Sequence, residues 1–274
     1  TVQRYETTTR YLEEFIKKEY QLSDIALNNL EANFISKFDA FLKIEKGCAQ
    51  NSAITRLKNL KKIIRIALEN DWIKKDPFAY YRFKPEKTDP EFLTMDEIKI
   101  ILAKEFTIKR VEQVRDVFVF CIFTGLAFSD VKDLSPEHLV KDNKGELWIR
   151  KNRQKTKIMC NIPVLPVAAS ILDKYKDVAE CTGKLLPVLC NQRMNSYLKE
   201  IADVCGIHKN LSTHTARHSY ATSICLANGV SMENVAKMLG HADTNVTKHY
   251  ARVLDQNIFK DMQKVNSCLS ELAI

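Results

Sequence analysis

Apolar residues recur at helical spacing along most of the chain. Residues 1 to about 85 show only this pattern, and residues 166–206 repeat it, so both regions are expected to be helical. Three apolar stripes stand out in the first region: Tyr11, Leu12, Phe15 and Ile16, then Leu30, Phe34, Phe38 and Phe41, then Leu57, Leu60, Ile64 and Ala67. Each stripe predicts one face of a helix turned toward a core.

The periodicity changes between Glu137 and Val164. A turn is expected at residues 143–145, apolar residues then alternate through Leu147 and Ile149, and a second run extends from Ile158 to Val164. This pattern predicts a small antiparallel sheet. The expected fold class is therefore mainly α with a small antiparallel β-sheet.

Residues 82–94 contain two prolines and mixed charges without periodicity, which is typical of an interdomain linker. Thr94 and Glu97 form a capping box that opens the next helix. We expect a helical domain at 1–85, a linker at 86–94 and a second domain at 95–274.

The whole-chain composition narrows the class of protein. The chain has 274 residues, a formal charge of +8 and a pI of about 9.0, which fits a polyanionic partner. No run is apolar enough to span a membrane, no signal peptide is visible, and the eight cysteines show no paired spacing. We expect mostly buried, reduced thiols in a bacterial cytoplasm. The missing initiator Met and the helical start suggest a fragment whose upstream domain has been removed.

One helix, roughly Asn51 to Asn70, carries a basic stripe. Its cations are spaced i, i+3, i+4, i+7 and comprise Lys58, Lys61, Lys62 and Arg65. A solvated basic face is the common explanation for one helix. In a chain this basic, we favour a stripe that contacts the phosphates of a polyanionic partner.

Residues 212–252 predict three short helices with glycines between them. The expected caps are Ser212 or Thr213 for the first helix, Ser231 for the second, and Asp243 or Thr244 for the third. Breaks this close together bring the side chains of all three helices into one region.

Four of those side chains suggest chemistry. His214 and Arg217 share a face of the first helix, His241 follows the glycine that ends the second, and Tyr250 comes nine residues later. An arginine and imidazoles around a phenol suit attack of the phenol on a phosphodiester.

A metal site is the alternative for part of this cluster. His214 and His218 have the i,i+4 spacing of metal ligands, yet no Glu follows His214 and no third ligand is evident. We expect neither a metal nor a cofactor, because the required cations are side chains.

The order H-T-A-R, then L-G-H, then Tyr250 resembles the C-terminal signature of the tyrosine recombinases, the phage-integrase family. Each short motif is weak alone, but the ordered set at these spacings is specific. The resemblance covers nearly the whole chain, strongly over residues 123–252. It implies a helical core-binding domain, a catalytic domain, and a C-shaped clamp in which a homotetramer acts on two duplexes.

The resemblance also implies the roles of the site residues. Tyr250 attacks a DNA phosphate, forms a 3′-phosphotyrosine link and releases a 5′-hydroxyl. Arg217 holds the non-bridging oxygens, while His214 and His241 donate to the same oxygens or manage the tyrosine's proton. The family places a catalytic lysine on the hairpin, where Lys155 in R-K-N-R-Q-K-T-K is the matching position. Lys157 is the rival for this general-acid role.

One position departs from the family pattern. T-G-L-A-F-S-D has Ala127 where the family has an arginine that holds the scissile phosphate, although Asp130 matches the family's acidic residue. We expect Arg153 to supply the missing cation. Residues two apart on a strand share a face, so Lys151 is expected to point inward as well, with Arg115 a weaker alternative.

The implied function is site-specific recombination of double-stranded DNA, as an integrase of a mobile element in the bacterial nucleoid, with possible accessory DNA-bending proteins. A DNA-binding relative that no longer cleaves and a type IB topoisomerase are the alternatives. Residues 255–274 have an amphipathic pattern. They would pack either on their own domain or on a neighbouring protomer.

Overall fold

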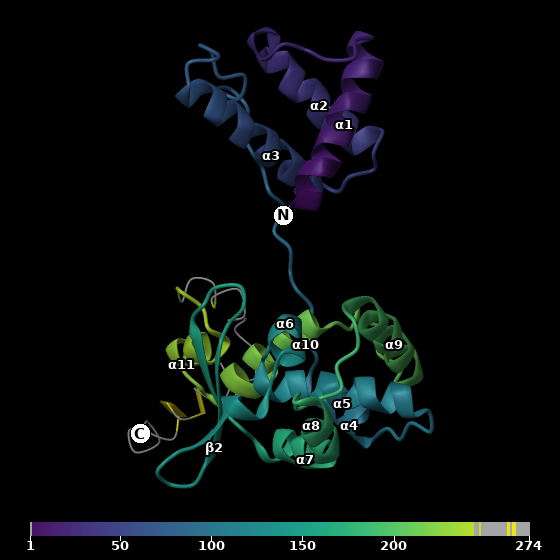
Figure 1. Cartoon of the computed structure of the whole chain (residues 1–274), viewed down its shortest axis with the longest axis vertical. Helices are drawn as coiled ribbons and strands as arrows, with labels where there is room; N and C mark the ends of the chain where they lie inside the picture. Colours follow the sequence, from purple (N-terminus) through teal and green to yellow (C-terminus); the bar gives the residue numbers. More distant parts are fainter. Residues whose placement is uncertain (1, 244–246, 248–261, 264, 267–274) are drawn as a thin grey trace, which may run out of the picture. The chain divides into compact units, whose positions relative to one another are not determined.

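The computed structural model describes residues 2–243, 247, 262, 263, 265 and 266. The chain divides into two compact units, Thr1–Asp89 and Pro90–Ile274 (Figure 1). The predicted nucleophile Tyr250, the third short helix and most of the predicted C-terminal amphipathic segment lie outside the described residues.

The first unit is built from helices, in the order α1 (Val2–Tyr20), a short 3-10 turn (Leu27–Asn29), α2 (Ala32–Ile44) and α3 (Gln50–Glu69). Its core is rich in aromatic residues. The ring centroid of Phe15 lies 5.1 Å from that of Phe34 and 5.2 Å from that of Phe38. The stripe predicted on α3 is buried in full, at Leu57, Leu60, Ile64 and Ala67. Burial of one helix face explains why the periodicity located these elements.

The second unit is mostly helical as well. Its α-helices are α4 (Met95–Ala103), α5 (Lys109–Thr124), α6 (Phe128–Lys132), α7 (Pro166–Lys174), α8 (Lys176–Thr182), α9 (Asn191–Val204), α10 (Thr213–Ser219) and α11 (Met232–Leu239). Short 3-10 turns occur at Pro136–His138 and Leu226–Asn228, and a π-helix at Tyr220–Cys225 continues α10. In the middle of the unit, the largely buried α5 packs against α7, α9 and α10 (Figure 1).

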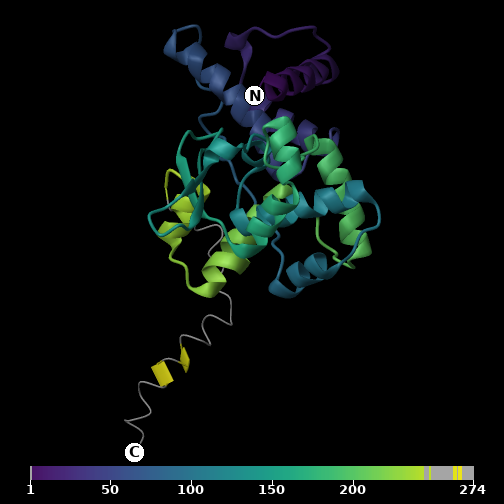
Figure 2. The ribbon, with the colours of Figure 1, turned by 60° about the horizontal axis from the view of Figure 1, so that its bottom comes forward.

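Three strands, β1 (Leu139–Lys141), β2 (Leu147–Asn152) and β3 (Met159–Pro163), form an antiparallel sheet in that order within the described chain. Ile149 pairs with Leu139 on one side and with Ile162 on the other. The sheet and α11 lie together on one side of the unit, and α11 packs against β3 (Figure 2). The predicted mainly α fold with a small antiparallel sheet is confirmed.

Two glycines allow this packing because they end helices where other residues approach closely. Gly125 ends α5 and Gly240 ends α11, both in the left-handed conformation. A Cβ on Gly125 would lie 2.4 Å from a ring carbon of Tyr220, and one on Gly240 would lie 2.7 Å from Sγ of Cys160. Both contacts are too short for any larger residue.

The start of the second unit is fastened to α10 and its π-helical extension. The N–H of Leu93 donates to Oγ of Ser219 at 2.8 Å, and the carbonyl of Leu93 accepts from Oγ of Ser223 at 2.5 Å. Lys209 donates to the carbonyl of Phe92 at 2.9 Å. Leu93 is itself buried, so this short segment is held by both its backbone and its side chain.

The described cysteines are free but differ in environment. Cys121, Cys160 and Cys225 are buried, whereas Cys181 and Cys190 are exposed. The expectation of mostly buried thiols is therefore wrong, since exposed cysteines carry no periodic signal that would place them. Within the described residues, no helix has the length and apolar character that crossing a membrane would require.

Candidate functional site

Helix α10 begins at Ser212, whose Oγ accepts from the N–H of Thr215 at 3.1 Å. Of the two predicted caps, Ser212 is therefore the one used. The cap sets the start of the helix, which places His214 in the first turn and Arg217 in the second. Arg217 points into the unit and is only 2% exposed, while His214 remains accessible.

Backbone carbonyls hold the guanidinium of Arg217. Nη1 donates to the carbonyl of Gly125 at 2.7 Å, and Nη2 donates to the carbonyl of Leu239 at 2.6 Å. These carbonyls lie at the C-terminal ends of α5 and α11, where the helix dipole is negative. The buried cation is thus fixed in one orientation before any anion arrives.

Arg217 also fixes the tautomer of His241. Its Nη2 lies 3.0 Å from Nε2 of His241, and a guanidinium can only donate. Nε2 of His241 therefore accepts, and its Nδ1–H donates to Oγ1 of Thr247 at 2.9 Å. Burial, with Arg217 and Arg153 adding to it, lowers the pKa of His241 to about 4, so the ring is neutral at neutral pH.

His214 lies in the same electrostatic environment. Partial loss of hydration lowers its pKa first, and the charges of Arg217, Arg153 and Lys155 lower it further. These cations come from two segments far apart in the sequence, α10 and the β2–β3 hairpin. The structure therefore brings together the arginine, the two histidines and the hairpin cations that the sequence singled out.

The hairpin tip is attached to two helices of the site. The N–H of Gln154 donates to Oδ1 of Asp130 on α6 at 2.9 Å, and Oγ1 of Thr156 donates to the carbonyl of Gly240 at 3.2 Å. Lys155, between them, is exposed at the turn. Of the two candidate lysines, it is Lys155 whose charge acts on His214.

Arg153 lies beside Asp130, with its Nε 3.7 Å from Oδ2 of the carboxylate. The side chain of Asp130 is 1% exposed and that of Arg153 is 14% exposed. Asp130 lies on α6, whose N-cap is Ala127, the position where the family has an arginine. A cation from the hairpin thus reaches the helix whose N-cap residue replaces the family's arginine.

The two other cations considered for this role are engaged elsewhere. Lys151 donates to the carbonyl of Asp133 at 3.1 Å and lies 3.0 Å from Nε2 of His138. Arg115 donates to Asp116 at 2.7 Å and to a carbonyl at the end of α4. Lys151 is buried on the inward face of β2 as expected, but it ties the sheet to the segment after α6 instead of joining Arg153 at Asp130.

The basic stripe on α3 remains open to solvent. Lys58 and Lys62 are exposed and Lys61 is half-buried. The amine of Lys58 lies 5.8 Å from the ring centroid of Phe83, and that of Lys61 lies 5.5 and 5.4 Å from the ring centroids of Phe78 and Phe83. Arg65 pairs with Glu69 at 2.7 Å on an exposed surface, where such a pair contributes little. The lysines are therefore the better candidates for contacts with an anion.

Within the described residues, no group of three or more potential ligands is arranged to hold a metal ion. Nε2 of His214 instead lies 3.0 Å from Nε2 of His218, so the two rings bind each other.

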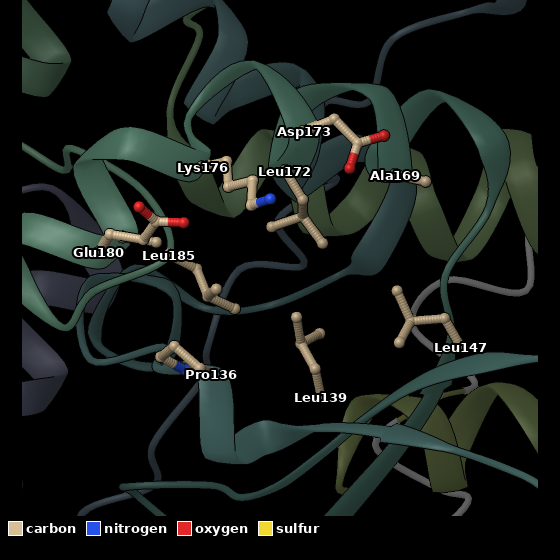
Figure 3. Close-up of a pocket in the computed structure, with 10 residues that line it drawn as sticks. Pro136, Leu139, Leu147, Ala169, Leu172, Asp173, Lys176, Glu180 and Leu185 are labelled. Atoms are coloured by element: carbon tan, nitrogen blue, oxygen red, sulfur yellow. The ribbon is translucent and has the colours of Figure 1, made fainter.

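A pocket of about 320 Å³ lies away from this chemistry, between the sheet and helices α7 and α8 (Figure 3). Leu139, Leu147 and Leu172 contribute to its lining, and none of the predicted site residues does. Its largely apolar walls do not suit a phosphodiester.

Comparison with known families decides what the cluster belongs to. Residues 1–85 match the model of the phage integrase SAM-like domain, and residues 91–257 match that of the phage integrase family. The chain belongs to the phage integrase family. It is accordingly a recombinase and integrase of the tyrosine type, a DNA strand transferase.

Individual relatives agree with this membership. The chain is 27% identical to tyrosine recombinase XerD of Listeria monocytogenes serotype 4b, over 96% of this chain and 91% of the relative. It is 24% identical to tyrosine recombinase XerC of Syntrophus aciditrophicus, over 89% of this chain and 82% of that one.

Solved structures share the fold. The recombinase XerH, solved bound to a palindromic difH substrate, has a TM-score of 0.73 at 18% identity, covering 95% of this phage-integrase-family chain and 78% of its own. A lambda integrase dimer solved on a core site gives 0.69 at 19% identity, covering 90% and 88%. The Tn1549 transposon integrase, solved with circular intermediate DNA, gives 0.69 at 17% identity, covering 94% and 91%.

Sequence reasoning missed several groups of the site. The carbonyls of Gly125 and Leu239 have no signature, because any residue supplies a carbonyl. Thr247, which binds His241, is fully buried and lies three residues before Tyr250. His218 was visible through its i,i+4 spacing from His214, but only as a possible metal ligand.

Proposed function

We propose that this phage-integrase-family protein is a site-specific recombinase that cuts and rejoins DNA through a 3′-phosphotyrosine at Tyr250. The observation that carries the proposal is the fixed guanidinium of Arg217, which is hydrogen-bonded to His241. Arg153 is also near His241, and after burial both arginines lower the pKa of this histidine. Phosphoryl transfer to a side-chain oxygen requires positioned cations, and side chains supply them in this proposal.

The chemistry balances with these side chains and water. The hydroxyl of Tyr250 loses its proton to water as its oxygen attacks phosphorus, and the bond to the 5′ oxygen breaks, so one phosphate ester replaces another and no ATP is consumed. Arg217 holds the non-bridging oxygens in bidentate fashion. Lys155, at the exposed hairpin tip, gives its proton to the leaving 5′ oxygen, a role worth roughly 10²–10⁴-fold in rate. The 5′-hydroxyl of a second strand reverses the step.

Arg153 replaces the arginine that Ala127 cannot provide. Its Nε lies 3.7 Å from the buried carboxylate of Asp130, too far for a hydrogen bond, so the attraction between the two charges orients the guanidinium while its two NH₂ groups can reach an anion. The two hydrogen bonds of the hairpin tip to α6 and α11 limit where Arg153 can move. Two arginines therefore bind the phosphate, as in the family, but the second one, Arg153, comes from the β2–β3 hairpin.

The first unit contributes DNA binding in this proposal. We assign residues 1–85 to a core-binding domain, 86–94 to a linker and 95–274 to the catalytic domain. The lysines of the α3 stripe contact phosphates. A homotetramer acts on two duplexes, with accessory DNA-bending proteins as possible partners, in the nucleoid of a bacterial cytoplasm. The transposon integrase among the structural neighbours supports a role in integrating and excising a mobile element.

A pool of nicked suicide duplexes with a randomised core tests the function without a known target site. Cleavage releases a short piece past the nick, so the covalent adduct cannot religate and accumulates. Adducts separated in denaturing gels and sequenced would reveal one preferred site.

A clean result needs two controls. Tyr250→Phe must give no adduct, and the captured site must recombine between two plasmids. Adducts spread over all sequences, together with relaxation of any supercoiled plasmid, would favour the topoisomerase alternative. Specific binding with no adduct at all would favour a non-cleaving relative.

A further inference from the structure

His218 follows His214 by one helical turn on α10, and the two rings contact each other directly. Their Nε2 atoms are 3.0 Å apart, and the rings are nearly perpendicular with centroids 4.4 Å apart. His218 is only 6% exposed, whereas His214 is accessible. A buried imidazole therefore lies behind His214, the histidine that the family resemblance places against the phosphate.

The contact restricts where the proton of His214 can reside. A hydrogen bond between two Nε2 atoms holds one proton, so one ring donates and the other accepts. If His218 donates, the proton of neutral His214 lies on Nδ1. If His214 donates, its Nδ1 carries only a lone pair. The pair thus decides whether His214 presents an N–H or an acceptor to its other neighbours.

Partial burial, and then the cations around the pair, lower the pKa of His214 and favour the neutral ring, which makes the tautomer decisive. Arg217 acts on this ring from α10, and Arg153 and Lys155 act on it from the hairpin. All three are cations, so they oppose a second proton on His214. A neutral ring has a single N–H, and its position is set by the partner of the other nitrogen.

We propose that His218 is a positioning residue that donates from its Nε2 to Nε2 of His214 and so holds His214 in the Nδ1–H tautomer. The non-bridging oxygens of a phosphate only accept hydrogen bonds, and Nε2 of His214 is already occupied by His218. Nδ1–H is then the group through which His214 donates to the phosphate. This inference rests on the proposed function for the role of His214 in cleavage, but not for the state of the ring.

Imidazole ¹⁵N NMR on the free full chain tests the tautomer directly. A His214→Asn variant assigns the signals. In the wild type, His214 is expected to show a protonated Nδ1 and an unprotonated Nε2. In His218→Phe that preference is lost, whereas His218→Gln keeps an N–H donor and preserves it. A wild-type His214 with its proton on Nε2 would overturn the proposal.

Cleavage of a nicked duplex supplies the second measurement. His218→Phe should cut about 10-fold or more slowly at unchanged DNA affinity, a part of the ~10²–10⁴ that a positioned proton donor contributes. His218→Gln should recover most of the rate, and exposed His208→Phe should match the wild type. Equal cleavage rates in His218→Phe and in the wild type would contradict the proposal.

If His218→Phe fails to fold, the test rests on His218→Gln, and loss of both the cleavage rate and the Nδ1–H tautomer in that variant would contradict the proposal. If neither the wild type nor any variant forms an adduct, the proposed function fails, while the NMR result still decides the tautomer.

Discussion

The guanidinium of Arg153 faces the carboxylate of Asp130 across 3.7 Å, although 23 residues separate the two in sequence. The carboxylate is buried, so it would be costly without a cation nearby. The pairing anchors Arg153 to the short helix that starts at Ala127. It joins the position that lacks an arginine to the hairpin that has one.

Replacing Arg153 should therefore abolish cleavage. Arg153→Ala removes one of two cations from the scissile phosphate, and a positioned arginine contributes ~10³–10⁵ in rate in related chemistry. DNA affinity should change little, and adding Ala127→Arg should restore part of the activity. Adduct formation is the measurement, with Arg115→Ala as a matched control. Wild-type rates in Arg153→Ala would show that Arg217 works without it.

Tyr250→Phe should bind DNA normally and form no covalent adduct, because the substitution removes only the nucleophilic oxygen. Gel shifts measure binding and denaturing gels measure the adduct. Tyr220→Phe is the matched control, since the hydroxyl of Tyr220 is buried against Sδ of Met238 at 3.0 Å. An adduct in the Tyr250→Phe protein would move the nucleophile elsewhere.

Cleavage should proceed in EDTA without any nucleotide. Arg217, Arg153 and Lys155 provide the positive charge at the proposed site, so no divalent ion is needed to neutralise the phosphate. The test compares initial adduct rates in EDTA and in Mg²⁺ at matched ionic strength. Cleavage that stops in EDTA and returns with Mg²⁺ would contradict the metal-free chemistry.

Neutralising Lys58, Lys61 and Lys62 to Gln should flatten the salt dependence of DNA binding. Each phosphate that the protein no longer neutralises lowers the log–log slope by about 0.9, so three such phosphates lower it by up to about 2.7. A triple Gln variant at exposed Lys99, Lys176 and Lys199 controls for net charge. Equal slopes in the two variants would make the α3 stripe an ordinary solvated face.

Acid should destabilise the second unit through His241. Its pKa is about 4 in the folded protein against an ordinary value of 6.5. The unfolded chain therefore takes up a proton in this window that the folded protein does not, so stability falls as pH drops from 6.5 toward 4. Denaturant unfolding should show a shallower fall for His241→Asn, and His208→Asn should match the wild type. Parallel pH dependences in all three would argue against a depressed pKa.

Much of this architecture could be predicted from local pattern. The cap at Ser231, the capping box at Thr94 and the helix end at Gly240 follow from chemistry within a few residues, and all three are present. The buried stripe of α3 follows from periodicity. The β2–β3 hairpin could be located because the spacing of apolar residues changes there from helical to alternating.

The features that could not be predicted from the sequence depend on interactions between residues distant in the chain. Strand alternation placed Lys151 and Arg153 on one inward face, but β2 ends at Asn152, and Arg153 lies in the turn that follows. There the hydrogen bonds of the hairpin tip to α6 and α11, not the pleat, set its direction. The carbonyls that hold Arg217 could not be found by residue type at all.

The fastening of Leu93 has a mechanical consequence. Tension applied along residues 86–90 passes into the second unit through Glu91 and Phe92, bonded to Asn210 and Lys209, and then through the backbone of Leu93, bonded to two serine hydroxyls. One of them, Ser219, stands two residues after Arg217 on the same helix. Part of any pull along residues 86–90 is therefore delivered to the helix that carries Arg217.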